Sequence, residues 1–176
     1  MTTNPEDRRF AVSPLVRLTL LCLYGALLLP LPFLPQAPGW LPLALVLGAW
    51  LLWGALGEVV IVTADAIELR YPWWIRSWLR SGWVLPWGEI VALKPRTTGQ
   101  GGLVYYFLDR QGCSYLLPMR MAGFSRFVAI VETKTGIDMR DVRPLAQPWM
   151  YGILLVFSLL LFAFDGFTIV NFLSHA

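Results

Sequence analysis

The sequence predicts an α+β membrane protein, in which three transmembrane helices flank a small antiparallel β domain between the second and third. Three observations support this fold class. Hydrophobic residues make up 57% of the 176 residues and charged residues only 14%, whereas ordinary soluble domains are about 25% charged. The shortage of charge is confined to three long apolar runs. Between the second and third runs, apolar residues instead occur in short segments bounded by turn residues, as in antiparallel strands.

The first two apolar runs predict a transmembrane helical hairpin over residues 15–57. The first span, about 15–34, has the roughly 20 residues that a helix needs to cross the hydrocarbon core. Prolines at its end should stop or distort its last turn. An uncharged turn leads into the second span, about 40–60. The polar residues 1–14 before the hairpin are expected to form a tail, and the first run is not followed by a signal-peptide cleavage site.

The third run predicts a transmembrane helix over 149–173, interrupted at Asp165 and Gly166. A carboxylate inside a span is costly and usually faces a partner or water. Asp165 is therefore a candidate contact with a partner. The alternative is that the span ends near Phe164 and that Asp165 lies at the outer interface.

Residues 58–143 predict the β domain, which we expect to have a pleckstrin-homology-like (PH-like) barrel with one closing helix. Six short apolar segments read as strands: "EVVIVT", "AIELRY", "GWVLPW", "EIVALKP", "LVYYFLD" and "CSYLLP". After these segments, the spacing of apolar residues changes to that of a helix. Four of them share one helical face: Phe124, Phe127, Val128 and Val131. Lys134 falls in the last turn of this helix, and Gly136 is its expected C-cap.

The stretch "RYPWWIRSWLRSGWVLPW" concentrates tryptophan and arginine shortly after the hairpin. Tryptophan favours the headgroup layer of a membrane, and arginine is attracted to anionic lipid. We therefore expect a membrane-interface site made of Trp73, Trp74, Trp78, Arg76 and Arg80. The alternative is that tryptophans of this stretch, above all Trp83 and Trp87, fill the core of the domain. Nucleic-acid stacking also uses aromatic residues with arginine, but a net charge of +3 does not favour it.

The segment "KPRTTGQGG" places Lys94 and Arg96 before a glycine-rich turn. It lacks the Gly-Lys-Ser/Thr ending of a phosphate-binding loop, and a helix does not follow directly. A hairpin turn is the expected structure. Lys94 and Arg96 are candidates for contact with a partner or a lipid headgroup.

The residues with catalytic chemistry do not form a recognisable set. His175 is the only histidine and is next to last in the chain. Cys22 and Cys113 lie far apart, one within an apolar run, so neither a disulfide nor a zinc site is indicated. Cys113 has no histidine that would activate it. We therefore expect a protein that is not an enzyme and that needs no cofactor or metal.

Basic residues predict the orientation in the membrane. Eleven lysines and arginines fall between the second and third spans, and the 35–40 turn has none. The positive-inside rule then places the N-terminus and the β domain in the cytoplasm, with the C-terminus outside or in a lumen.

The strand order resembles that of bacterial PH-like domains fused to membrane helices. The resemblance rests on "VTADAIELR", "VLPWGEIVAL", a hairpin, a strand after "DRQG" and the closing helix. The stretches "GQGGLVYYFL" and "RPLAQPWMY" resemble uncharacterised cyanobacterial membrane proteins. The arrangement is also similar to a photosystem I assembly factor family with two N-terminal spans, which lacks a third span. The basic residues near the first strand pair do not reproduce a phosphoinositide-binding motif, so that ligand is not transferred.

The resemblance implies residence in an inner, plasma or thylakoid membrane. It also implies a non-enzymatic adaptor or assembly factor for a membrane protein complex, with a photosynthetic complex as its specific version. The predicted partners are anionic lipid headgroups and another membrane protein, and not a nucleic acid. Two alternatives stay open: a lipid-binding or lipid-sensing protein, and a minor transporter subunit in which Asp165 faces a pathway.

Overall fold

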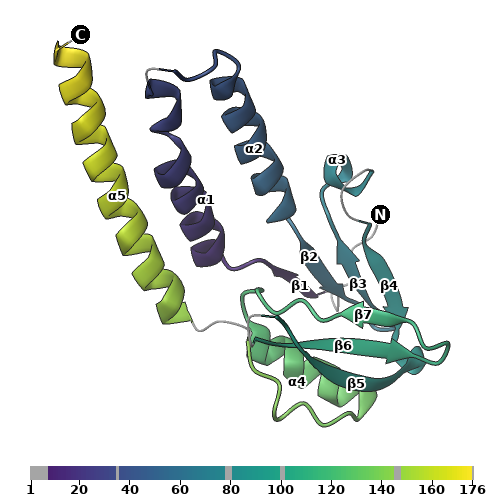
Figure 1. Ribbon diagram of the computed structural model, residues 1–176. Coiled ribbons are helices and arrows are strands. Elements are labelled where there is room, and N and C mark those ends of the chain that lie inside the picture. The colour runs from purple at the N-terminus through teal and green to yellow at the C-terminus, as the bar shows by residue number, and fades with distance from the viewer. Residues whose placement is uncertain (1–7, 35, 78–80, 100–101, 145–147, 176) are drawn as a thin grey trace. The chain divides into compact units, whose positions relative to one another are not determined.

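The structure is a computed structural model that describes residues 8–34, 36–77, 81–99, 102–144 and 148–175. The chain divides into two compact units, and each is discontinuous in sequence (Figure 1). Residues 1–13 and 57–146 form one unit, called the β domain below. Residues 14–56 and 147–176 form the other, called the helical unit. The class is α+β with antiparallel sheets, as predicted.

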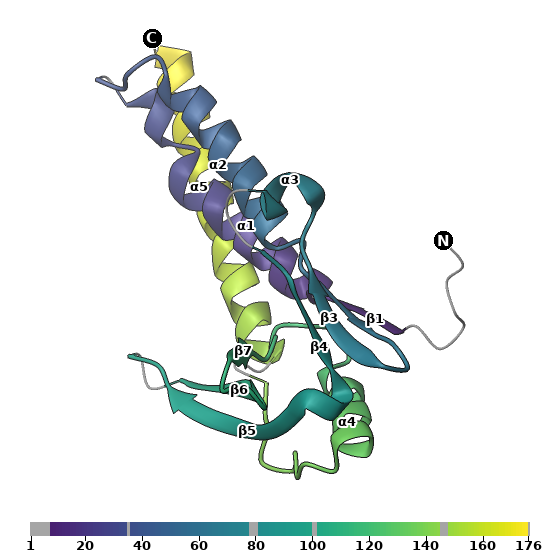
Figure 2. The ribbon, with the colours of Figure 1, turned by 90° about the vertical axis from the view of Figure 1, so that its right-hand side faces the viewer.

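Two antiparallel sheets make up most of the β domain. The first has the order β1-β2-β3-β4, and its strands are β1 (Arg8–Ala11), β2 (Val59–Val62), β3 (Ala66–Arg70) and β4 (Trp83–Pro86). The second has the order β5-β6-β7, and its strands are β5 (Ile90–Thr97), β6 (Leu103–Asp109) and β7 (Ser114–Leu116). The strands of the first sheet run in a different direction from those of the second (Figures 1 and 2). A short 3₁₀ helix, η2 (Trp87–Glu89), joins β4 to β5.

Strand β1 was missed by the sequence prediction, which assigned residues 1–14 to a tail. Arg8–Ala11 pair with β2 in register, so that Phe10 lies opposite Val60. Phe10 and Val12 are buried, while Arg9 and Ala11 are exposed. This alternation has the period of a half-buried strand. The hairpin of the helical unit is therefore an insertion between the first two strands of a sheet.

Helix α4 (Phe124–Thr135) completes the β domain as predicted. Phe124, Phe127 and Val131 are buried on one face of this helix. They join the core formed by both sheets, where the ring of Phe127 meets that of Phe10 edge to face, with centroids 5.6 Å apart. Gly136 ends the helix in the left-handed conformation, with φ of 70°, which glycine adopts without strain.

The helical unit contains α1 (Pro14–Leu28), the 3₁₀ turn η1 (Leu31–Phe33), α2 (Leu41–Ala55) and α5 (Pro148–His175). Of the described residues, two segments are helical, long and apolar enough to cross a membrane: Pro14–Phe33 and Pro148–Asn171. The prediction of three such helices is thus wrong.

The predicted second span fails because its helix ends early. Helix α2 has 15 residues, about 22 Å at 1.5 Å per residue, whereas the hydrocarbon core is about 30 Å thick. The residues after it, "GEVVIV", begin with glycine and glutamate and continue with β-branched side chains. Such side chains favour strands, and they form β2 instead of extending the helix.

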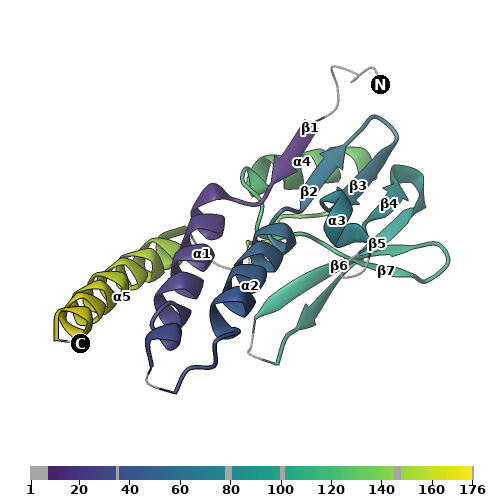
Figure 3. The same ribbon diagram turned by 90° about the horizontal axis from the view of Figure 1, so that it is seen from above.

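Helix α1 is the central helix of its unit and packs between α2 and α5 (Figures 1 and 3). Gly25 lies against Phe162 of α5, where a Cβ atom would come within 2.5 Å of the ring. Gly48 of α2 similarly accepts the phenol of Tyr24, whose hydroxyl donates a hydrogen bond to the Leu45 carbonyl at 2.8 Å. Small residues allow close helix contact in the way found in membrane proteins.

The chain enters and leaves the helical unit at one end. Arg17, near the start of α1, donates a hydrogen bond to the carbonyl of Leu56, just after α2, at 2.9 Å. Thr19 of α1 donates to the carbonyl of Tyr151, near the start of α5, at 3.2 Å. The start of α1, the end of α2 and the start of α5 therefore lie together, and α1 and α5 run parallel.

Candidate membrane-facing site

A single helical turn, α3 (Trp73–Arg76), forms in the Trp-rich stretch after β3. Pro72 precedes it in an extended conformation, and its carbonyl accepts hydrogen bonds from the amides of Ile75 and Arg76, both at 3.0 Å. The side chain of Ile75 is fully buried. The turn is thus held by one buried aliphatic residue and two backbone hydrogen bonds.

The first residue of this turn carries an unusually exposed indole. Trp73 is 85% exposed, the largest value among the exposed large hydrophobic side chains of the described residues. Trp74 is half-buried, and Arg76 is exposed one position after Ile75. A large aromatic side chain in water is unfavourable, but an indole beside a cation suits the lipid headgroup layer. The turn has the composition and exposure of a membrane-interface element.

The other residues of the Trp-rich stretch divide into two groups. Trp78 and Arg80, predicted at the membrane interface, lie outside the described residues. Trp87 is buried in the core and donates a hydrogen bond from Nε1 to the Thr63 carbonyl at 3.1 Å. Trp83 packs against the core and tilts over the ring of Tyr115. The core alternative therefore holds for Trp83 and Trp87.

Lys94 and Arg96 lie two residues apart on β5 and are both exposed. Lys94 pairs with Tyr106 in the register of β5 and β6, and the guanidinium of Arg96 lies 5.7 Å from the centre of the Tyr106 ring. Leu93, the residue before Lys94, packs against the core. Lys94 and Arg96 therefore belong to the outer face of the second sheet, together with an aromatic ring.

Asp165 lies within an unbroken helix, so the chain stays helical through Asp165 and Gly166, where the apolar run is interrupted. It lies about 25 Å along the axis from Pro148 at 1.5 Å per residue. It shares a helix face with Ser158 and Phe162, the face that packs on α1. Its Oδ2 atom is buried without a hydrogen bond among the described residues. Arg17 is not its partner, because Arg17 lies at the opposite end of the unit, where it stacks on Trp53.

A groove of about 630 Å³ adjoins the segment that carries α3 and was not predicted. Tyr71 and Ser81, on either side of α3, line it together with Thr98, which follows β5. Its walls also contain Leu69, Trp83, Val104, Tyr115, Leu116, Leu117, Pro118 and Met119, with Glu58, Ser114 and Arg120 as further polar groups. The groove thus combines apolar side chains with several polar groups, as small-ligand sites do. The groove could not be recognised in the sequence, because the residues that line it come from separate strands.

Two tyrosines of this groove are fixed by carboxylates. Tyr71 donates a hydrogen bond to Glu58 at 3.0 Å, and Tyr115 donates one to Asp109 at 3.2 Å. Burial, followed by the hydrogen bond to Asp109, raises the pKa of Tyr115 above its usual value. The two hydrogen bonds orient the rings of Tyr71 and Tyr115. Among the described residues, histidine, cysteine and carboxylate side chains form no cluster that could hold a metal ion.

Comparison with known proteins gives one strong similarity. The chain is 51% identical over 166 residues to "Uncharacterized protein slr0269" of Synechocystis sp. (strain ATCC 27184 / PCC 6803 / Kazusa). The aligned region covers 89% of this chain and 83% of the Synechocystis protein. No family model matches the sequence.

Proposed function

We propose a function for the family to which this chain and the Synechocystis protein both belong: a non-enzymatic, membrane-anchored adaptor whose β domain rests on the lipid surface and holds a partner membrane protein. The observation that carries the proposal is the exposed indole of Trp73 on a turn anchored by the buried Ile75. A soluble protein has little reason to maintain such an element.

The helical unit supports the membrane part of this proposal. Helix α1, continued by η1, and helix α5 have the required length and composition. The start of α1, the end of α2 and the start of α5 share one end of the unit, so every connection to the β domain leaves from one side. Because the basic residues concentrate in that domain, this side is the cytoplasmic one, and the end of α5 lies on the opposite side.

Two observations support the PH-like and adaptor parts of the proposal. The β domain has two successive antiparallel meanders followed by one helix, in agreement with the strand order on which the resemblance rests. The outer face of the second sheet offers Lys94, Arg96 and Tyr106. Aromatic and arginine side chains are common at the centre of protein interfaces. A complex of the photosynthetic membrane is the specific partner that the resemblance implies.

The lipid contact is testable in the full-length protein after Cys22 and Cys113 are replaced by serine. Trp73→Cys, labelled with an environment-sensitive dye, is reconstituted in vesicles that contain lipids with quenchers at the headgroup or deep in the acyl chains. We expect quenching by the headgroup quencher and less by the deep one. A label at Arg110→Cys, in the exposed turn before β7, gives the reference for a site elsewhere on the domain. An unquenched label at position 73 would refute lipid contact by α3.

The adaptor role is testable by affinity purification from native membranes after mild solubilisation. We expect a membrane protein to co-purify with the wild type and to be lost when Lys94 and Arg96 are both changed to glutamine. Arg110→Gln removes an exposed cation from another turn and should leave the complex intact. Purification of the chain without any protein in constant ratio would argue against an adaptor.

Two other functions have specific observations in their favour. The groove beside α3 favours lipid binding, for which bound lipid should be extracted from the purified protein and identified by mass spectrometry. The Asp165 oxygen on the helix-packing face, which has no hydrogen bond within the described part of the chain, favours a minor subunit of a transporter. In that case Asp165→Leu should reduce transport by the parent complex without preventing membrane insertion.

A further inference from the structure

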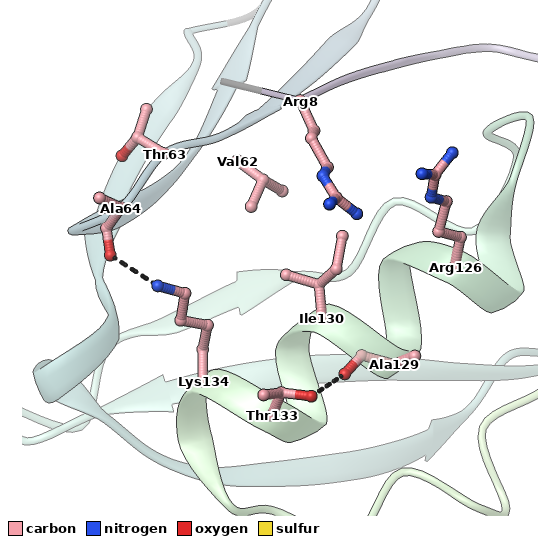
Figure 4. Close-up of a pocket in the computed structure, with 9 residues that line it drawn as sticks. All are labelled: Arg8, Val62, Thr63, Ala64, Arg126, Ala129, Ile130, Thr133 and Lys134. Carbon is pink, nitrogen blue, oxygen red and sulfur yellow. Dashed lines mark hydrogen bonds between the residues drawn. The ribbon is translucent and has the colours of Figure 1, made fainter. Parts of the chain in front are cut away.

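A second groove, separate from α3 and from the outer face of the second sheet, opens between β1, the β2–β3 turn and helix α4 (Figure 4). Its volume is about 480 Å³. Val62 and Ile130 form an apolar wall of the groove. Its basic side chains come from two elements distant in sequence: Arg8 from β1, and Arg126 and Lys134 from α4. Strand β1, which the sequence prediction missed, supplies Arg8 to this groove.

The charge of this groove is strongly one-sided. Arg8, Arg126 and Lys134 are all exposed, and no described residue that lines the groove is acidic. Lys134 donates one hydrogen bond to the carbonyl of Ala64 at 3.3 Å, which holds the ammonium at the groove and leaves its other donors available. Three cations without a lining carboxylate create a positive potential that attracts anions.

The hydroxyl groups of the groove are already engaged. Thr63 donates to the carbonyl of Ala66 at 3.0 Å and accepts from the amide of the same residue at 3.1 Å. Thr133 donates to the carbonyl of Ala129 at 2.7 Å. The donors that remain for a ligand are therefore the cationic groups, which form stronger hydrogen bonds with anions than neutral donors do.

We propose that this groove binds a phosphate-bearing ligand. The guanidinium groups of Arg8 and Arg126 present forked donors that match phosphate oxygens, and the ammonium of Lys134 contributes a third charge. The volume is within the range of small-ligand sites, and the wall of Val62 and Ile130 suits the organic part of a phosphate ester. The phosphate group is shared by two sources, a lipid headgroup and a soluble phosphate compound.

The test uses the full-length protein in nanodiscs of phosphatidylcholine and two soluble probes. Inorganic pyrophosphate represents the soluble source, and dihexanoyl-phosphatidylglycerol, below its micelle concentration, represents the headgroup. Binding is followed by isothermal titration calorimetry. We expect one probe to bind in a salt-dependent manner, and Arg8→Gln and Arg126→Gln each to weaken it about tenfold, since each removes a charge-assisted contact.

Arg110→Gln removes the same charge from an exposed turn outside the groove and should leave the affinity unchanged. Preference for pyrophosphate identifies a soluble ligand, and preference for the short-chain lipid identifies a headgroup. Equal melting temperatures for all variants would show that the substitutions act on binding, because Arg8 and Arg126 are exposed. The proposal is overturned if neither probe binds the wild type in the millimolar range, or if Arg110→Gln weakens binding as much as Arg126→Gln does.

Discussion

Phe10 should be a core residue of the β domain, although it precedes the first membrane helix. It is 7% exposed and packs edge to face on Phe127. Truncation of a buried phenylalanine to alanine costs about 3–5 kcal/mol, a large part of the roughly 5–15 kcal/mol that stabilises a domain. With an m-value of roughly 2 kcal/mol per molar urea, Phe10→Ala should lower the unfolding midpoint by about 2 M.

The register of the first sheet allows this measurement on a soluble protein. Ala11 and Val59 are direct partners in the ladder of β1 and β2, so a short glycine-serine turn can join residues 1–13 to 57–146 and replace the hairpin. Urea unfolding of this joined domain is followed by circular dichroism, with Arg9→Ala as the exposed control. If Phe10→Ala changes stability by no more than the roughly 0.5 kcal/mol typical of surface positions, then residues 1–14 are a tail and the assignment of β1 is wrong.

Three further predictions concern other contacts. Gly25→Val should loosen the helical unit, since a Cβ there would meet Phe162 at 2.5 Å, and the full-length protein should melt at a lower temperature in detergent. Asp109→Ala should destabilise the joined domain by about 1–3 kcal/mol in urea unfolding, because three donors lose their acceptor; unchanged stability would contradict this. The hydrogen bond from Arg140 lowers the pKa of Asp138, so this pair stabilises the fold above the unfolded-state pKa and loses its effect as the pH falls through the folded-state value. Arg140→Gln should raise that pKa in an NMR titration, and an unchanged pKa would exclude the pair as its cause.

Features that depend on the spacing of neighbouring residues were predictable from the sequence. The face of α4 follows from the spacing of Phe124, Phe127 and Val131, and its end follows from Gly136. Trp87 is buried, as the core alternative for the Trp-rich stretch predicted. These predictions depend on periodicity and turn chemistry, which neighbouring residues largely determine.

Other features depended on residues far apart in sequence. Arg8–Ala11 carry the alternation of a strand, but the partner strand lies beyond the whole hairpin, so four residues alone gave a weak signal. The early end of α2 reflects competition with the β ladder that Val59–Val62 join, which an apolar count does not register. Both grooves unite side chains from separate elements, and their composition appears only once the strands are paired.

Because the hairpin is inserted between β1 and β2, the first sheet can form only after the hairpin has been synthesised. Strand β1 leaves the ribosome first, yet its partner follows only after α1 and α2 have been made. If the two ends of the hairpin lay on opposite sides of a bilayer, β1 and β2 would be separated and the sheet could not close. Pairing of Phe10 with Val60 therefore requires both ends of the hairpin to lie on the side of the β domain. A chain inserted in the wrong topology would expose an unpaired β2 edge, the kind of surface that quality-control proteases and chaperones recognise.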